Sequence, residues 1–256
     1  MGVVTRLTRR RRQLVEEKAR VLNRMQCDLQ AVCPGLLAIT GEADNLWFLN
    51  LLACRDDIRK LAGLRLRSLL GIAAIGRKYA ALIQAWQACA LFSDEAQWAG
   101  PMIVADARRI LALKREIDAL ETAMTEIACD CELARRIDTV PGFGAVCSAE
   151  LAGEIGTLDR FSTEASLALY LGMASLAHST GLHPGSRRPR QVNTRARSAM
   201  MTGVARPIGQ VPRSRAHYDK KRAQGKTHNQ AVRALGRHLV RVLWSMLKHG
   251  HNYEMR

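Results

Sequence analysis

Ile137-Asp-Thr-Val-Pro-Gly-Phe-Gly-Ala145 is the stretch that decides how the fold is read. Gly142 and Gly144 stand one residue apart, just ahead of an apolar, alanine-rich run that is typical of a helix. Glycine adopts positive φ and lets another backbone come close, and free N–H groups at a helix start bind phosphate oxygens. The turn therefore predicts a helix-hairpin-helix-like grip on a nucleic-acid backbone. An ordinary interhelical turn is an equal alternative on these residues alone.

Composition points to a basic, helical protein. The 256 residues contain 39 lysines and arginines against 23 acidic residues, for a net charge of +16, and only 5% aromatic residues. Such an excess of one sign favours an anionic polymer as partner. The seven cysteines show no framework spacing, which favours free thiols in a reducing compartment. No secretory signal and no apolar run long enough to span a membrane is visible, so we expect a soluble, cytoplasmic protein.

Two long helices are predicted in the first half. One runs from about Thr5 to Val32 and the other from about Ala105 to Cys131, because in each the apolar residues recur on one stripe. They predict either an antiparallel helical hairpin, with residues 34–104 inserted at its far end, or a parallel homodimeric coiled coil. Short helices are expected in the insert, at Asp44–Cys54, Asp57–Leu70 and Tyr79–Leu91.

The second half changes character and is also predicted to be helical. We expect two domains: 1–132, a helical or coiled-coil region with its insert, and 133–256, a helical domain that contains the glycine turn. A polar segment at Ser175–Asn193 is poor in helix formers. The helices predicted in this half are Ala145–Ile155, Glu164–Leu171, which Ser162 or Thr163 would cap, Thr194–Val204 and His228–Lys248.

Positive charge is concentrated in this second domain. Between residues 187 and 241 the basic residues meet almost no acid except Asp219. Cations that reach phosphates release condensed counterions, so a run this long and this one-signed favours nucleic acid over a merely solvated face. The candidate nucleic-acid-binding residues are Gly142, Gly144, Arg187, Arg188, Arg190, Arg195, Arg197, Lys220, Lys221, Arg222 and Lys226.

These pieces resemble the insertion-sequence transposases of the 110/116/902 type. The resemblance covers nearly the whole chain and is most specific from Leu133 to Gly250. It rests on Ile137–Gly144, on Glu150-Leu-Ala-Gly-Glu-Ile-Gly156 with Arg160-Phe161, on Tyr170-Leu-Gly-Met173, and on Tyr218-Asp-Lys-Lys-Arg-Ala-Gln-Gly-Lys226. Leu7-Thr-Arg-Arg-Arg-Arg-Gln-Leu-Val15 is similar to the start of the family's central helical region.

The resemblance implies that full-length members pair an N-terminal RuvC-like nuclease domain with a serine-bearing transposase domain. In that nuclease domain four acidic residues hold divalent metal, expected to be Mg²⁺. Those acids normally precede the Leu7–Val15 region, so we expect that this chain lacks the nuclease domain and that it binds no metal itself. Its own acidic pairs are interpreted as helix caps and solvated faces: Asp56 with Asp57, Asp94 with Glu95, and Asp106.

The serine of the transposase domain is expected shortly after Tyr170-Leu-Gly172. When the sequences are aligned by Gly181, the serine position holds Thr180, and Ser179 directly precedes it. Either hydroxyl could attack a phosphodiester and form a covalent protein–DNA link. Ser179 is the first choice because Thr180 is β-branched and bulkier. A loop that only forms hydrogen bonds is the alternative.

The sequence thus leads to a mostly α-helical DNA transposase, an insertion-sequence recombinase that acts by nucleic-acid binding and phosphodiester strand exchange and is a truncated member of its family. A non-catalytic nucleic-acid-binding remnant is the alternative function. By resemblance the partners are DNA, an element-encoded guide RNA and further copies of the chain joined through the long helices. No membrane is expected among the partners.

Overall fold

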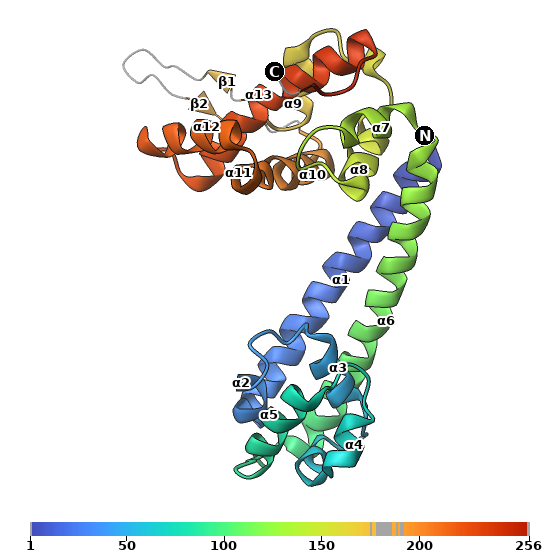
Figure 1. The fold of residues 1–256 in the computed structure, drawn as a ribbon, viewed down its shortest axis with the longest axis vertical. Coiled ribbons are helices and arrows are strands. Elements are labelled where there is room, and N and C mark those ends of the chain that lie inside the picture. The colour runs from blue at the N-terminus through green and yellow to red at the C-terminus, as the bar shows by residue number, and fades with distance from the viewer. Residues whose placement is uncertain (1, 175, 178–185, 188, 190–191, 255–256) are drawn as a thin grey trace. The chain divides into compact units, whose positions relative to one another are not determined.

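The computed structural model describes residues 2–174, 176–177, 186–187, 189 and 192–254. It is mostly α-helical, as predicted, and forms two compact units (Figure 1). Unit 1 comprises Met1–Arg9 and Leu120–Arg256, and unit 2 comprises Arg10–Ala119. The domain division at residue 132 stays a prediction. Among the described residues, no helix is both long enough and apolar enough to cross a bilayer.

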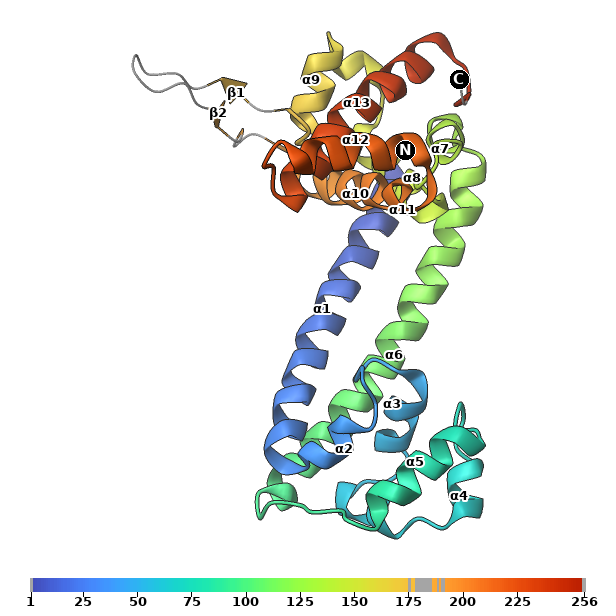
Figure 2. The same ribbon diagram turned by 60° about the vertical axis from the view of Figure 1, so that its left-hand side comes forward.

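Helices α1 (Gly2–Val32) and α6 (Ala96–Cys129) belong for most of their length to unit 2, where they run antiparallel and side by side (Figure 2). Their ion pairs fix the direction: Glu17 accepts from Arg109 Nη2 at 2.7 Å, and further along α1 the Nε of Arg24 donates to Asp106 at 2.8 Å. As the residue number rises on α1, that of its partner on α6 falls. Of the two predicted arrangements, the antiparallel hairpin is the one the chain adopts.

The insert of unit 2 packs short helices onto this hairpin. Its core consists of fully buried side chains such as Met25, Leu29, Phe48 and Ile110. The single helix predicted for Asp57–Leu70 was wrong, because the backbone is extended at Leu64 and Arg65. Helix α6 begins nine residues before its predicted start at Ala105, with Pro101 inside it near its beginning. The elements between α1 and α6 are α2 (Pro34–Ala38), α3 (Leu46–Ala53), η1 (Ile58–Gly63), α4 (Leu66–Leu70) and α5 (Arg77–Gln87).

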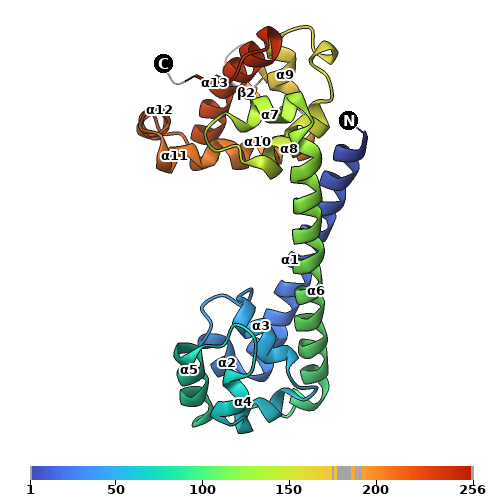
Figure 3. The same ribbon diagram turned by 45° about the vertical axis from the view of Figure 1, so that its right-hand side comes forward.

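Unit 1 is built around α8 (Ala145–Ile155), whose residues from Cys147 onward are all buried. Helices α7 (Glu132–Asp138) and α10 (Thr194–Ala205) pack against α8 (Figure 3). Helix α13 (His228–His249) places Val232, Leu235, Leu239 and Leu243 in the same core. The Thr163 cap of α9 (Glu164–Tyr170) forms as predicted, its hydroxyl oxygen accepting from Ser166 N.

Five of the described elements of unit 1 were not predicted. They include α12 (Pro212–Ala223), which buries none of its residues and so lacks the apolar stripe that reveals a helix. The others are η2 (Leu158–Arg160), α11 (Pro207–Gln210) and a two-stranded antiparallel ladder of β1 (Leu176–Ala177) with β2 (Ser186–Arg187).

Candidate nucleic-acid interface

The glycine turn joins α7 to α8, and its two glycines have different surroundings. Gly142 has φ of +93°, and a Cβ there would lie 2.5 Å from both the Gly203 carbonyl oxygen and Pro207 Cγ. Phe143 is buried beside it, where a Cβ on Gly203 would lie 2.5 Å from its ring. Gly142 is therefore needed for the close approach of α10 and α11 to the turn, a role that the sequence reading did not assign.

Gly144 is the member of the pair that faces outward. It is exposed, is the N-cap of α8 and has no capping side chain, so the first-turn amides of α8 lack a side-chain acceptor from the cap. Near it lies only a cation: a Cβ on Gly144 would be 3.7 Å from Arg206 Nη1. The phosphate grip stays a prediction, and it now concerns Gly144 and Arg206 more than Gly142.

A buried carboxylate, Glu154, organises the polar centre of unit 1. Only 3% of Glu154 is exposed, and it lies at the end of α8. Arg9 binds it with a two-pronged guanidinium contact, at 2.9 Å from Nε and 3.1 Å from Nη2. Asn193 Nδ2 donates at 2.7 Å to Glu154 Oε2, the oxygen that Arg9 Nη2 also binds. The Arg9 contact ties the first turns of α1 to the end of α8.

Three charged or amide groups shift the titration of Glu154. Burial alone would raise its pKa, but the hydrogen bonds from Arg9 and Asn193 and the charges of Arg9 and Arg195 outweigh burial, so the pKa lies below its ordinary value. The carboxylate is therefore ionised at neutral pH and keeps both partners in place.

Tyr170 and Asn193 extend this centre to the two ends of the segment 174–192. The Tyr170 hydroxyl donates to the Glu154 carbonyl at 2.6 Å, and Asn193 Nδ2 lies 2.7 Å from that hydroxyl. Asn193 N also donates to Tyr170 O at 3.0 Å, and its side chain caps α10 by accepting from Arg195 N and Ala196 N. The end of α9 and the start of α10 are thereby held together. Sequence reasoning missed these roles of Glu154 and Asn193, although Glu154 and Tyr170 lie in the quoted motifs.

The predicted nucleophiles Ser179 and Thr180 lie outside the described residues, as do Arg188 and Arg190. Of Arg187 the structure gives only its backbone in β2. Arg195 and Arg197 lie in the first turn of α10, and both are exposed. The stem of Arg197 packs on Gly172, where a Cβ would lie 2.8 Å from its Cγ.

The cations of α12 form an exposed basic surface. Lys220 and Arg222 are exposed, Lys221 is half-buried, and Asp219, which Arg215 binds at 2.8 Å, is the only acidic residue of this helix. Arg222 donates to the Lys226 carbonyl at 2.6 Å and so holds the turn into α13. The structure thus brings together Lys220, Lys221, Arg222 and Lys226, hereafter the α12 surface.

Two histidines lie beside the α12 surface. The rings of His217 on α12 and His238 on α13 stack at 6.1 Å. Burial lowers the pKa of His217, and the charges of Lys221, His238 and Lys220 lower it further. His217 therefore favours its neutral form, so the positive charge of this surface resides on its lysines and arginines.

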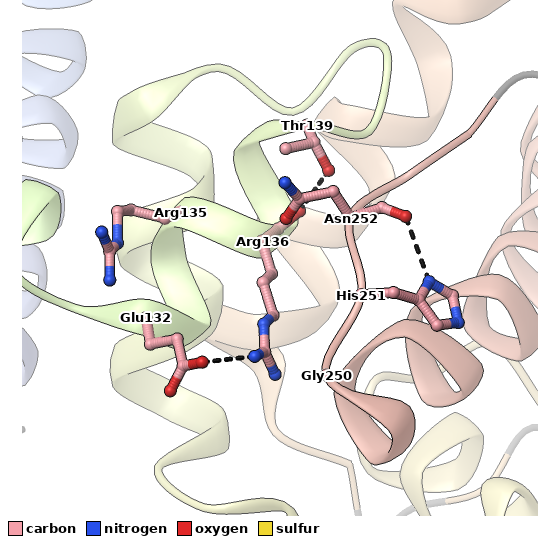
Figure 4. A pocket seen from close by; sticks show the side chains of 7 residues that line it. All are labelled: Glu132, Arg135, Arg136, Thr139, Gly250, His251 and Asn252. Carbon is pink, nitrogen blue, oxygen red and sulfur yellow. Dashed lines mark hydrogen bonds and ion pairs between the residues drawn. The ribbon is translucent and has the colours of Figure 1, made fainter.

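A pocket of about 540 Å³ lies between α7 and the residues that follow α13 (Figure 4). Arg136 pairs with Glu132 inside it, and Tyr253 N donates to Thr139 Oγ1 at 2.9 Å, which holds the chain end against α7. Both α7 and α13 end at this pocket, so their carbonyl ends offset the charge of its arginines. We assign it no ligand. It is lined by Glu132, Arg135, Arg136, Thr139, Gly250, His251 and Asn252.

Three of the acidic residues of unit 2 that the sequence singled out have partners within the chain. Asp57 accepts from Arg59 N as the N-cap of η1, and Asp56 pairs with Arg108. The interpretation of Asp106 as a solvated acid was wrong, because it is 6% exposed and pairs with Arg24. Among the described residues, no three His, Cys, Asp or Glu side chains are grouped to hold a metal ion.

Comparison with known proteins fits this arrangement. The family model described as "Transposase IS116/IS110/IS902 family" matches residues 134–219, which run from α7 into α12. The chain is 26% identical over 249 residues to the insertion element IS116 uncharacterized 44.8 kDa protein of Streptomyces clavuligerus, covering 94% of this chain and 62% of the relative. Over residues 134–219 the chain is therefore similar to the IS116/IS110/IS902 transposase family.

Two further relatives match a shorter part of this chain. It is 34% identical over 154 residues to the insertion element IS900 uncharacterized 42 kDa protein of Mycobacterium paratuberculosis, with 59% of this chain and 39% of the relative covered. It is 34% identical over 152 residues to the insertion element IS110 uncharacterized 43.6 kDa protein of Streptomyces coelicolor, covering 59% and 37%. The chain thus spans about two fifths of the length of these two relatives.

Proposed function

We propose that this chain binds DNA through unit 1 and takes part in the strand exchange of an insertion sequence. The observation that carries this proposal is the α12 surface. Helix α12 buries no residue, is rich in lysine and arginine, and begins inside the segment that matches the transposase family. A helix without an apolar face gains little from folding onto a core. Its cations are therefore available to phosphates, which supports a role in binding a nucleic-acid backbone.

The test is a binding titration over a range of salt concentrations. We expect wild-type chain to bind labelled duplex DNA with an affinity that falls steeply with salt. In the triple variant Lys220→Gln, Lys221→Gln, Arg222→Gln the affinity should fall less steeply with salt, the slope of log affinity against log salt decreasing in magnitude by about 2 to 3. A matched control removes three exposed cations of unit 2 instead: Arg65→Gln, Arg67→Gln, Arg77→Gln. An equal effect of the two triples would refute a localised surface.

The catalytic part of the proposal is a nucleophilic attack by Ser179, with Thr180 as the alternative. In that step the hydroxyl oxygen bonds to phosphorus and its proton passes to a base. The bond between phosphorus and one deoxyribose oxygen breaks, and this oxygen leaves with a proton. Support comes from the match of residues 134–219 to the transposase family model and from the polar centre at Glu154, which holds together the ends of the segment that contains both residues. Arg187, Arg188, Arg190, Arg195 and Arg197 would bind the phosphate.

Trapping a covalent adduct tests this step. The chain is incubated with DNA carrying a cleavable phosphodiester, together with a RuvC-like nuclease domain and Mg²⁺. We expect an adduct with wild type and with Thr180→Ala, and none with Ser179→Ala. If wild type binds DNA but gives no adduct, the chain is the non-catalytic nucleic-acid-binding remnant.

Two partners belong to the proposal as well. An element-encoded guide RNA would bind the same basic surface, and competition between RNA and DNA for the chain tests it. Association of copies of the chain through the long helices is the second.

A further inference from the structure

Helix α6 exposes an apolar stripe near its beginning. Trp98 is 75% exposed and Met102 is 54% exposed, while Ile103 and Ile110 on the opposite face are fully buried. Pro101 and Ala105 are exposed as well. Trp98, Pro101, Met102 and Ala105, hereafter the α6 stripe, follow the i, i+3, i+4, i+7 spacing of one helix face. An exposed apolar group of this kind, centred on a tryptophan, marks a contact surface.

The α6 stripe is complementary to itself when two copies meet antiparallel. A two-fold axis between Pro101 and Met102 places the large Trp98 of one copy opposite the small Ala105 of the other. The exposed acids Asp94 and Glu95 lie at one end of the stripe, and Arg108 and Arg109 lie at the other. Antiparallel pairing sets Glu95 opposite Arg108, whereas parallel pairing would set like charges together.

We propose that the α6 stripe binds the same stripe of a second copy of this chain, with the two α6 helices antiparallel. The inference deepens the proposed self-association, because it names the surface. Such a contact is isologous, so it closes as a dimer. From Ala96 to Arg109 it spans about 20 Å of helix. A contact this short buries less than a standard interface, so the dimer forms in the micromolar range rather than below it.

Sedimentation velocity over a range of protein concentrations tests the stripe. Wild type should shift from monomer to dimer as concentration rises. Trp98→Ala should weaken the dimer by at least about tenfold, as is usual for a central tryptophan. Leu66→Ala is the matched control, because Leu66 is 46% exposed and lies outside the stripe. A wild type that stays monomeric up to about 100 μM, above the range that the contact area predicts, overturns the inference, and so does a dimer that Trp98→Ala leaves unchanged.

A charge exchange tests the direction of pairing. Glu95→Arg and Arg108→Glu each put like charges at two contacts of an antiparallel dimer, and should each weaken it roughly fivefold. A mixture of these two variants should dimerise again, because every contact then joins opposite charges. Arg108 now pairs with Asp56, whose side chain is 91% exposed, so the exchange hardly affects folding. Failure of the mixture to recover overturns the antiparallel stripe.

DNA binding is measured on the same samples. If wild-type chain binds no DNA but dimerises through Trp98, the proposed DNA-binding function fails and the interface stands. If it binds DNA and Trp98→Ala leaves the dimer intact, the interface alone fails.

Discussion

Single alanine substitutions of Gly142 and Gly144 should have different effects on stability, because Gly142 is packed against α10 and α11 whereas Gly144 is exposed. In Gly142→Ala the new Cβ would meet the Gly203 carbonyl oxygen and Pro207 Cγ at 2.5 Å, and φ is +93°. Left-handed backbone costs alanine about 1–2 kcal/mol, and overfilling a packed site costs about 1–3 kcal/mol. We therefore expect Gly142→Ala to lower the free energy of unfolding of unit 1 by about 2–5 kcal/mol.

Gly144→Ala is the matched control for the same turn. Gly144 has φ of −80°, and its Cβ would make one ordinary contact, at 3.7 Å with Arg206 Nη1. Only the weaker capping of alanine remains as a cost, on the order of 0.5–1 kcal/mol.

Hydrogen exchange measured for individual peptides reports the stability of unit 1 separately from that of unit 2. Gly142→Ala should raise the exchange rate of α8 and α10 amides by at least about tenfold, and should lower Tm by roughly 5–15 °C. Gly144→Ala should leave both nearly unchanged, yet weaken DNA binding if the turn grips phosphate. Equal stability of the two variants would refute the packing argument. Unchanged DNA affinity in Gly144→Ala would leave the turn an ordinary connection.

Three further outcomes follow from the contacts of unit 1. Glu154→Ala should lower the free energy of unfolding of unit 1 by about 1–3 kcal/mol in urea titrations. This is less than for a fully buried ion pair, because the Arg9 side chain is 48% exposed. A loss no larger than that of Asp159→Ala, on the exposed η2, would contradict this prediction. Because folding lowers the pKa of Glu154, its contribution to stability is fully present above the ordinary glutamate pKa and is lost as pH falls through the pKa of the folded state. Below about pH 5, a plot of Tm against pH should therefore be flatter for Glu154→Gln than for wild type. Gly203→Ala should destabilise α10 through the Phe143 ring, and the added variant Phe143→Leu, with a smaller side chain, should recover part of the lost Tm; no recovery would show that the ring is not the obstacle.

The long helices could be predicted because their burial has a period. Leu14, Val21, Met25 and Leu29 are all buried on α1, as the stripe in the sequence requires. Whether α1 and α6 pair parallel or antiparallel could not be predicted, because an apolar stripe packs equally well against a helix running in either direction. It is settled by charges far apart in the sequence, such as Glu17 with Arg109.

The polar parts were harder to predict, for two physical reasons. Helix α12 has no buried face, so nothing in its sequence repeats with a helical period. The partners of Glu154 come from the start of α1 and the start of α10, at sequence separations of 145 and 39. A local motif contains Glu154 but not its partners, so the motif alone could not show that it is a buried centre.

The net charge of the chain overstates how many cations are available to bind nucleic acid, because several arginines form ion pairs within the chain. Arg9, Arg24 and Arg237 each bind a carboxylate within the chain. Their positive charge is used to join elements of the fold, so replacing any of them perturbs stability before it perturbs binding. The α12 surface differs because its helix supplies a single acid, Asp219, and that acid is held by Arg215. A series of variants can rank the lysines and arginines by whether each binds a carboxylate within the chain. It should divide into variants that unfold and variants that no longer bind DNA, with Lys220, Lys221 and Arg222 in the second group.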